Sequence, residues 1–317
     1  MINKNVKWHV AAITCQLLFG VNSSVMKSLL SSSWMTVIGF TFTRFVFCFV
    51  MYWSIGFFMP KEKITVKDVL LMLRAGSLGI IITMVAFPAA LQFISPIIIS
   101  LVAALTPIVV MLFSALFLRE SLSFKKTIGI VLGISGAALV ILHNGGSGHS
   151  PNSLPGFFLA LIYLLANGGY YVVLRITPAR FGTITMMKWI YLFATVLFVV
   201  PGIMELPKQR VFSAEATLPV LLQFGFVLIL VNVLGIFLLT VSIRHIKATT
   251  VSMYINLQPL AASITAILIG QDILTWDKPL ALLLIASGVF LVSRSNSILP
   301  SKITNYTNGS QNDKQQC

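Results

Sequence analysis

Long apolar runs, separated by short polar stretches, fill nearly the whole of this 317-residue chain. A helix needs about 20 mostly apolar residues to cross a bilayer, and ten runs approach that length. They are residues 8–27, 35–58, 69–92, 96–117, 125–142, 154–174, 184–204, 217–243, 248–269 and 278–294. Because the runs lack the alternation of barrel strands, each span is predicted to be a helix that satisfies its own backbone. The pattern predicts an all-α integral membrane protein with ten transmembrane helices.

A proline, an acid and a glycine in the first half of the chain recur in the second half at a constant offset of 152 positions. The offset aligns Pro107 with Pro259 and Gly136 with Gly288 without a gap. Each copy would hold five spans, and because five is odd, the second copy enters the membrane from the opposite side. Inverted repeats of this kind are typical of carriers, whose substrate site lies near the midplane between the copies. We therefore expect two inverted five-helix repeats around a central cavity.

The repeat also divides the chain into parts. We expect a first five-helix repeat over residues 1–142, a Gly/Ser linker over 143–155, a second five-helix repeat over 156–294 and a polar C-terminal tail over 295–317. The same offset aligns Glu120 with Asp272, and each acid lies a few residues before a lysine. We interpret both acids as loop residues that cap helices or form ion pairs.

Charged residues are too few for a soluble protein and too dispersed for a nucleic-acid-binding protein. Hydrophobic residues make up 57% of the chain and charged residues 9%, with a mean hydropathy of +0.94. A soluble domain carries about a quarter charged residues. The net charge of +14 is spread over the predicted loops rather than clustered, so we expect no nucleic acid partner.

The distribution of Lys and Arg predicts the orientation. With the N-terminus inside, fifteen of the 22 basic residues fall in cytoplasmic segments, four in outer segments and three within spans. This excess follows the positive-inside rule. It predicts a multi-pass protein of a bacterial inner membrane with both termini in the cytoplasm, and hence the lipid bilayer as a partner.

No pattern in the chain predicts an enzyme, a metal site or a cofactor. The sequence contains neither a P-loop nor an HExxH motif, and Cys15, Cys48 and Cys317 are scattered. None of the eight acids falls in the middle of a predicted span, which disfavours a carboxylate proton relay. We expect no catalytic residue, no metal and no cofactor.

The residues whose insertion into a membrane costs most free energy are the basic side chains inside apolar runs. Arg44 lies nine residues into the second span, and a charge at that depth costs about 2.5 kcal/mol or more unless it faces a cavity or a partner. Arg44 either contacts an anionic group of a substrate or bonds structurally to neighbouring helix carbonyls. Lys188 has a similar place in the seventh span, about one turn from the start, where snorkelling to the interface is the alternative.

Polar side chains in three other spans are predicted to converge on the cavity. Tyr254 and Gln258 share a helix face beside Pro259, and a proline inside a helix frees a carbonyl that must line a wet cavity or find another donor. For any single amide, hydrogen bonding between helices is the simpler interpretation, but the set favours a polar cavity. The predicted substrate-binding residues are Asn22, Arg44, Asn167, Tyr171, Lys188, Tyr254, Asn256 and Gln258.

Small residues at helical spacing mark the fifth and tenth spans. Gly129, Gly133 and Gly136 lie on the fifth, and Gly288 lies on the tenth. Such residues let helix backbones approach closely, either within the chain or between two copies of it. We favour packing within the chain, and we expect a monomer or a homodimer.

The order of these motifs resembles the EamA family of the drug/metabolite transporter superfamily. The resemblance covers residues 8–294 and is carried by Phe19-Gly20, Asn22, Lys27, Arg44-Phe45, Pro107, Leu118-Arg119-Glu120, Gly129, Gly133, Gly136, Pro259, Asp272 and Ser287-Gly288. It implies ten helices in two inverted repeats, and secondary transport of amino acids, other metabolites or drug-like compounds. Phe19 stands where the family usually has tryptophan, and Asn167 lies in a stretch where another tryptophan is common.

Together, the repeat, the charge distribution and the resemblance predict a secondary transporter. It would export small organic metabolites, such as amino acids or drug-like compounds, by alternating access. Spans one to four and six to nine would surround the cavity, with spans five and ten outside. A membrane-embedded enzyme acting on lipid would need a nucleophile, a metal site or an acid–base pair that we do not find in the sequence. A passive channel is disfavoured by the inverted repeat within one chain.

Overall fold

The described part of the protein is built of helices. A computed structural model describes residues 6–60, 62–118, 124–143, 154–176, 181–246, 248–272 and 275–294. The first half holds α1 (Val6–Ser31), α2 (Val37–Phe57), α3 (Val66–Gly76), η1 (Ser77–Ile81), α4 (Ile82–Leu91), α5 (Pro96–Ala103), α6 (Thr106–Leu118) and α7 (Phe124–His143). The Glu120 loop, most of the predicted Gly/Ser linker and the C-terminal tail lie outside the described residues.

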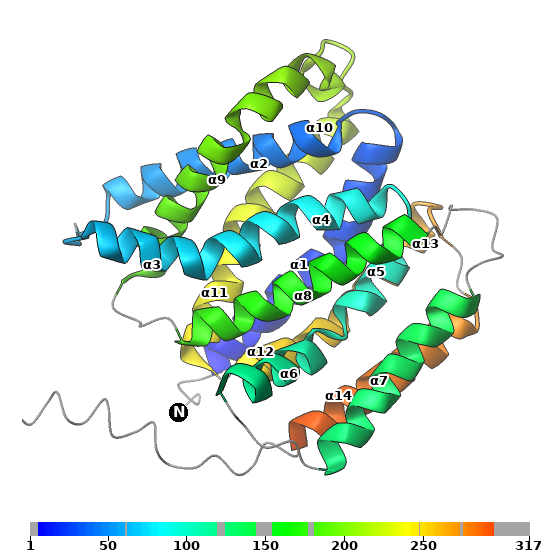
Figure 1. Ribbon diagram of the computed structural model, residues 1–317. Helices are drawn as coiled ribbons and strands as arrows, with labels where there is room; N and C mark the ends of the chain where they lie inside the picture. Colours follow the sequence, from blue (N-terminus) through cyan, green and yellow to red (C-terminus); the bar gives the residue numbers. More distant parts are fainter. Residues whose placement is uncertain are drawn as a thin grey trace, which may run out of the picture.

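The second half follows the same order of elements. It holds α8 (Leu154–Ile176), α9 (Thr183–Glu205), η3 (Leu206–Lys208), η4 (Arg210–Phe212), α10 (Leu218–Gly225), η5 (Phe226–Gly235), α11 (Ile236–His245), α12 (Ala248–Met253), η6 (Tyr254–Asn256), α13 (Leu257–Leu268) and α14 (Asp277–Arg294). Figure 1 shows α7 and α14 side by side at one edge of the bundle.

Fewer spans qualify by length and composition than the ten that the sequence predicts. Among the described residues, seven helices are long and apolar enough to cross a membrane. An eighth qualifies if α3 and α4, which meet at a bend of 41°, form one span. Neither α7 nor α14 is among the eight, so the count of ten stays a prediction.

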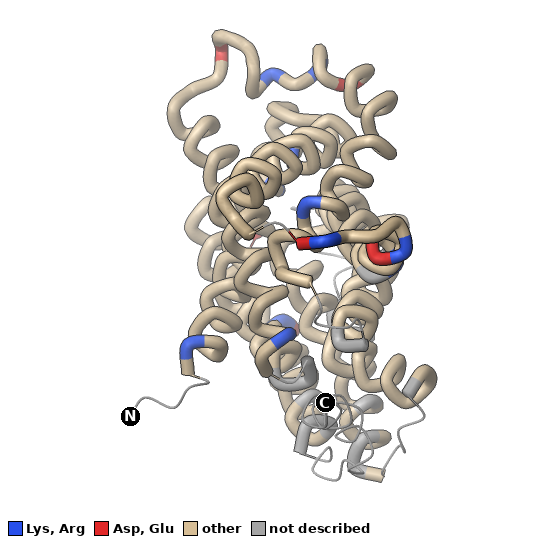
Figure 2. Tube along the Cα trace, turned by 90° about the vertical axis from the view of Figure 1, so that its left-hand side faces the viewer, with Lys and Arg blue, Asp and Glu red and all other residues tan. Residues whose placement is uncertain are grey.

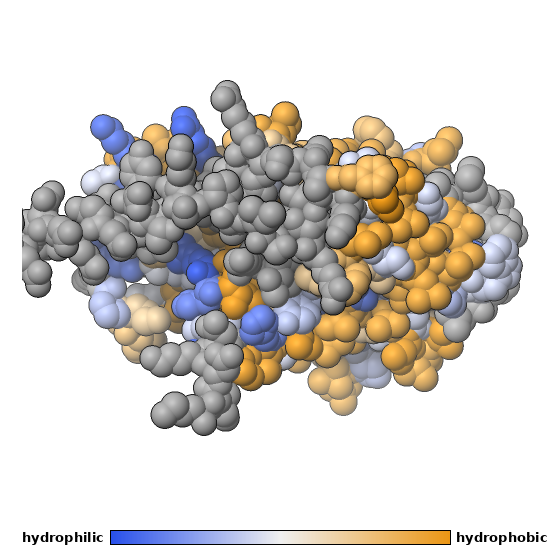
Figure 3. All heavy atoms as spheres, turned by 90° about the horizontal axis from the view of Figure 1, so that it is seen from below, coloured by the Kyte–Doolittle hydropathy of each residue, from blue (hydrophilic) through white to orange (hydrophobic). Residues whose placement is uncertain are grey.

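The exterior is that of a protein surrounded by lipid. Charged residues are sparse along the described chain (Figure 2), and hydrophobic side chains cover much of the described surface seen in Figure 3. Val200, Met204 and Leu268 are all more than 60% exposed. In water, apolar surface this extensive would be an aggregation liability, whereas a bilayer covers it.

Helices of the two halves pack against each other in pairs that a two-fold relation exchanges. α2 packs along α9, and α7 packs along α14. α1 contacts η5 and α11, while α8 contacts η1 and α4, which is the same pairing seen from the other half. The halves are therefore intertwined rather than set side by side.

Irregular segments of the helices also correspond between the halves. The π-helix η1 in the first half matches the longer π-helix η5 in the second. The break between α5 and α6 at Ala104 and Leu105 matches the 3₁₀ segment η6 before α13. Each break lies two or three residues before a proline, Pro107 or Pro259, which has no N–H to continue the helical hydrogen bonds. Thr106 Oγ1 instead donates to Ala103 O at 2.6 Å.

The small residues of α7 and α14 face each other within the chain. A Cβ added to Gly288 would lie 2.9 Å from Gly133 N and also meet Gly129 O. One added to Gly136 would lie 2.9 Å from Ala281 O and from Ile285 Cγ1. The 152-residue offset converts one set of contacts into the other. The predicted packing within the chain is thus confirmed, and it needs glycine because backbones touch at these points.

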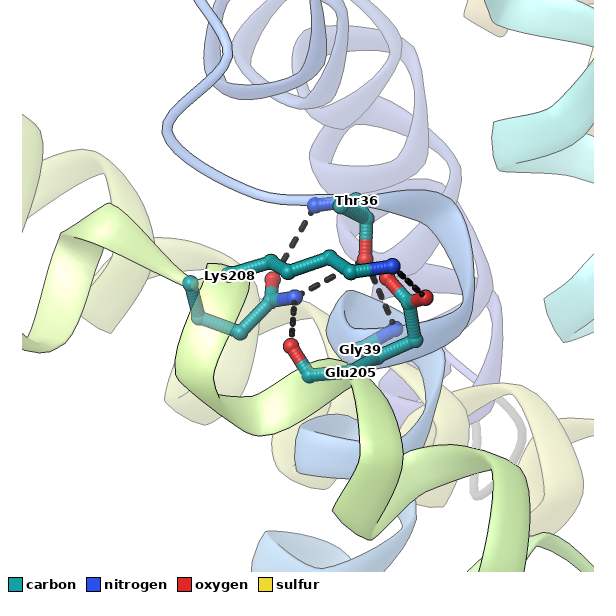
Figure 4. Close-up of polar contacts among 5 residues, drawn as sticks. Thr36, Gly39, Glu205 and Lys208 are labelled. Atoms are coloured by element: carbon teal, nitrogen blue, oxygen red, sulfur yellow. Dashed lines mark hydrogen bonds and ion pairs between the residues drawn. The ribbon is translucent and has the colours of Figure 1, made fainter.

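Two helix N-termini are capped by loops from the opposite half, at opposite ends of the α2–α9 pair. The Thr36 N–H donates to Gln209 Oε1 at 3.0 Å, and Gln209 Nε2 donates to Thr36 Oγ1 at 2.8 Å, just before α2 (Figure 4). At the start of α9, the Gly182 N–H donates to Glu62 Oε1 at 3.0 Å. In each case the capping side chain follows the partner helix, so α2 and α9 run antiparallel and each satisfies an open N–H at the start of the other.

A short ion pair joins the loop before α14 to the first turn of that helix. Lys278 Nζ lies 2.6 Å from Asp272 Oδ1, and both side chains are largely buried, at 3% and 11% exposure. This agrees with the interpretation of Asp272 as a loop residue that forms an ion pair. The corresponding contact of Glu120 falls outside the described residues.

Candidate substrate-binding cavity

A cavity lies between the two halves of the chain. The space between its walls, together with the solvent at its mouth, measures about 680 Å³. Each half supplies eight lining residues: Phe19, Asn22, Met26, Arg44, Ile80, Thr83, Met84 and Phe87 from the first, and Tyr163, Asn167, Tyr170, Val231, Asn232, Ile236, Leu239 and Gln258 from the second. Among the described residues, none of α5, α6, α7, α9 and α14 contributes to this lining, so the predicted fourth and seventh spans add no wall residue.

Four of the predicted site residues meet in this cavity. Asn22 comes from α1, Arg44 from α2, Asn167 from α8 and Gln258 from α13. They lie far apart in the sequence and come from both halves, so the inverted packing is what brings them together. A close backbone approach at Gly20 helps to place Gln258, because a Cβ there would lie 2.7 Å from Gln258 O.

Among the described residues, the guanidinium of Arg44 has a hydrogen-bond partner at Nε and none at Nη1. Its side chain is only 4% exposed. Its Nε donates to Asn232 Oδ1 at 3.2 Å, and its guanidinium carbon lies 5.3 Å from the centre of the Phe40 ring. Its Nη1 has no hydrogen-bond partner in the described protein. The acceptor of the Arg44 hydrogen bond in the described protein is a side-chain amide, whereas the alternative predicted helix carbonyls.

The π-helix η5 explains how Asn232 reaches Arg44. Asn232 Nδ2 donates to Val227 O, five residues earlier, at 2.5 Å. That bond fixes the amide so that its oxygen is left for Arg44. π-helical segments occur frequently at functional sites, and η5 follows this tendency by presenting a buried amide in an otherwise apolar wall.

Two further amides tie the first helix of each half to the broken helix of the other. Asn167 on α8 donates to Thr106 Oγ1 at 3.2 Å, beside the break before α6. Gln258 on α13, at the repeat position of Thr106, donates to Gln16 Oε1 on α1. Both bonds are partly or fully buried, where a satisfied polar group strongly favours one arrangement. They lie at the cavity wall and join the two repeats.

The other four predicted residues do not line the cavity. Tyr171 is buried against Gln16, whose Nε2 donates to its hydroxyl at 3.4 Å. Tyr254 OH lies 2.8 Å from His9 Nδ1, and Asn256 Nδ2 donates to Met253 O within its own turn.

Lys188 is a residue of α9 and lies beside the C-terminal end of α2. Its Nζ is 4.5 Å from the centre of the Trp53 ring, and its side chain fills the space beside Gly56. It therefore pairs with an aromatic face rather than with the cavity, while Arg44 keeps the interior position. The two halves differ at this point.

Sequence reasoning missed several residues of the wall. Asn232 is the most important of them, and its signal was present as one amide inside the apolar run Phe226–Gly235. The cost argument used for Arg44 applies to it, because a buried amide needs a hydrogen-bond partner. Thr83, Tyr163 and Tyr170 gave no comparable signal, since hydroxyl-bearing residues are common in membrane helices.

Arg44 is the one charged side chain in the part of the lining that the structure describes. Among the described residues, no Asp or Glu side chain lines the cavity. Phe19, Phe87, Met26 and Met84 provide apolar walls. Largely apolar walls with a few convergent polar groups are typical of sites for small organic ligands.

Comparison with known proteins agrees with this architecture. The sequence model described as "EamA-like transporter family" matches residues 6–142 and 154–294. Among curated proteins, the "Uncharacterized transporter YetK" of Bacillus subtilis is 20% identical over 254 residues, which cover 78% of this chain and 76% of that protein. The "Uncharacterized transporter YvbV" of the same organism is 29% identical over 188 residues, covering 59% of each chain.

A solved crystal structure has the same fold. It matches with a TM-score of 0.64 at 16% sequence identity, and the match covers 93% of this chain and 100% of that one. At this identity the likeness concerns the fold alone.

Proposed function

This chain belongs to the EamA-like transporter family of the drug/metabolite transporter superfamily, and we propose that it is a secondary transporter that exports small organic metabolites by alternating access. Its family and its multi-pass helices make it a membrane transporter. The proposal adds the class of solute, the direction and the mechanism. Membership of the family implies amino acids, other metabolites or drug-like compounds as solutes. Arg44 and the cavity amides would hold them.

The cavity carries the proposal. It draws equally on both halves, and those halves are related by an inversion across the membrane. A site between two inverted repeats can be presented to either side of the membrane by equivalent movements of the two repeats. The two cross-half caps, Gln209 on Thr36 and Glu62 on Gly182, lie at opposite ends of the α2–α9 pair. Movement of one half against the other must loosen these contacts.

The described protein also supports transport over lipid chemistry. The functional groups at the wall are one guanidinium, four amides, three hydroxyl-bearing side chains and aromatic rings. Within the described residues, no group of three or more His, Cys, Asp or Glu side chains is placed to hold a metal ion. Binding a solute is what this set of groups is suited to do.

A comparison of metabolites in cells and medium tests the function and its direction. Cells that overproduce the protein should release at least one small organic solute into the medium, and cells that lack the protein should retain it. Cells overproducing Arg44→Ala at equal membrane levels are the control. Identical profiles in all strains would contradict the proposal, and uptake of a solute from the medium would reverse the proposed direction.

A further inference from the structure

Arg44 gives the cavity a net charge that the described protein does not balance. Among the described residues, it is the one charged residue that lines the cavity. Asn232 and the Phe40 ring contact the guanidinium, and both are neutral. A buried charge without a counter-ion is costly, so a bound solute with one negative charge would lower the free energy of the site.

Arg44 also has a hydrogen-bond donor to spare. Its Nη1 is buried and has no hydrogen-bond partner in the described protein. A guanidinium donates in a planar fork that matches the oxygens of a carboxylate. The bond from Nε to Asn232 fixes the rotation of the group, so the remaining donors are oriented before the solute arrives.

A second residue that lines the same cavity also carries a buried polar atom without a partner in the described protein. Asn22 is 6% exposed, and its Oδ1 has no hydrogen-bond partner. The amides of Asn167 and Gln258, in contrast, already donate to Thr106 and to Gln16. Since an unpaired buried acceptor costs free energy, Asn22 would favour a solute that carries a donor besides its anionic group.

The charge balance separates two kinds of carboxylate. An amino acid zwitterion brings a carboxylate and an ammonium group, so the net charge of the occupied cavity would remain +1. A hydroxy acid brings a carboxylate and a neutral donor, and the occupied cavity becomes neutral. In a site of low dielectric this difference is large compared with its value in water.

We propose that the solute of this cavity is an organic monocarboxylate that carries a neutral hydrogen-bond donor and an apolar body, held by Arg44 and Asn22. The inference rests on the proposed function, because it concerns the solute of the same cavity. The apolar body would lie against Phe19, Phe87 and the methionines of the wall. Monoanions should be preferred over zwitterions, and zwitterions over cations.

Four probes with one skeleton test the inference on the purified full chain in lipid nanodiscs. They are mandelate, its neutral amide mandelamide, the zwitterion phenylglycine, and phenylacetate, which lacks the hydroxyl donor. Mandelate should bind about tenfold or more tighter than mandelamide and phenylglycine, since bonds to a charged partner are the strong ones. It should bind several-fold tighter than phenylacetate, because only mandelate offers a donor to Asn22.

Variants assign the preferences to residues. Arg44→Gln should bring the mandelate and mandelamide affinities to within a few-fold of each other. Asn22→Leu should remove the difference between mandelate and phenylacetate while keeping the preference for charge. Arg74→Gln is the matched control, because Arg74 is an exposed residue of α3 and does not line the cavity; its probe affinities should equal those of the unmodified protein.

Several results would overturn the inference. They are a preference for mandelate that survives Arg44→Gln, tighter binding of phenylglycine than of mandelate, or binding of neither carboxylate at millimolar concentration. The ligand series on the unmodified protein keeps the test valid if a variant fails to fold. Anion-selective binding without flux across liposomes would contradict the transport proposal alone. Flux that favours zwitterions or cations would contradict only the anion inference.

Discussion

At the residue scale, the pair formed by Arg44 and Asn232 is the centre of the site. The sequence predicted Arg44, because its charge is expensive inside an apolar run. It did not predict Asn232 as the partner, since the two residues are 188 positions apart. Spacing within a helix shows which residues share a face, but it does not show which other helix that face meets.

A second limit explains why one predicted residue of the ninth span fell outside the cavity. Tyr254 and Gln258 were predicted to share a helix face, yet only Gln258 lines the wall. The 3₁₀ turn η6 and the break before Pro259 rotate the chain between them. A regular 3.6-residue period no longer holds across such a break, so a face assigned from it is unreliable.

Changing Asn232 should lower solute affinity in two different ways. Asn232→Leu removes the acceptor for Arg44 Nε, a bond to a charged group worth about 1.5–3 kcal/mol, so affinity should fall about tenfold or more. Asn232→Asp keeps an acceptor but supplies an internal counter-charge, so anion affinity should also fall. Binding titrations of a monocarboxylate measure both.

Gln223→Leu is the control for the Asn232 variants. Gln223 is an amide on the neighbouring α10 that does not line the cavity, and its loss should leave affinity unchanged. A purely structural role for Asn232 would predict that Asn232→Asp, which retains the hydrogen bond, binds the anion as well as the unmodified protein does.

At the element scale, irregular helices position the site. The 152-residue repeat located both prolines, and with them the breaks that precede α6 and α13. Neither π-helix was predicted, because a π segment differs from an α-helix by one residue of register and leaves no distinct apolar period. The glycine contacts of α7 and α14 were predictable, since small residues at helical spacing point to close helix packing.

Adding one methyl group at Gly288 should separate α7 from α14. The new Cβ of Gly288→Ala would meet Gly129 O and Gly133 N, and overpacking of this kind costs about 1–3 kcal/mol. The temperature of thermal unfolding in detergent should fall. Gly225→Ala is the matched control, because nothing lies within 4 Å of a Cβ there. Equal losses of stability in both variants would argue against close α7–α14 contact as the cause.

At the scale of the whole molecule, the two halves form one unit through exchanged pairs of helices. The sequence predicted this inversion from an offset and an odd number of spans. It could not predict that α2 and α9 would cap each other through Gln209 and Glu62, because loop contacts depend on where the helices end. The cavity is a property of the assembled halves, and neither half lines it alone.

The orientation predicted from basic residues can be tested by cysteine labelling of intact cells. In a chain whose Cys317 is replaced by serine, Ser213→Cys should react with a membrane-impermeant maleimide from outside. Lys63→Cys should react only after the membrane is permeabilised. Both positions are exposed and lie at opposite ends of the α2–α9 pair. Reversed accessibility of the two sites would show the opposite orientation.

The central claim is that solute crosses the membrane through the cavity that contains Arg44. Solute flux in proteoliposomes tests it most directly, with the unmodified protein, Arg44→Ala and the exposed-arginine control Arg74→Ala compared at equal amounts of folded protein. The account predicts flux with the unmodified protein and with Arg74→Ala, and a rate close to that of empty liposomes with Arg44→Ala. Unchanged flux in a well-folded Arg44→Ala protein would contradict the account.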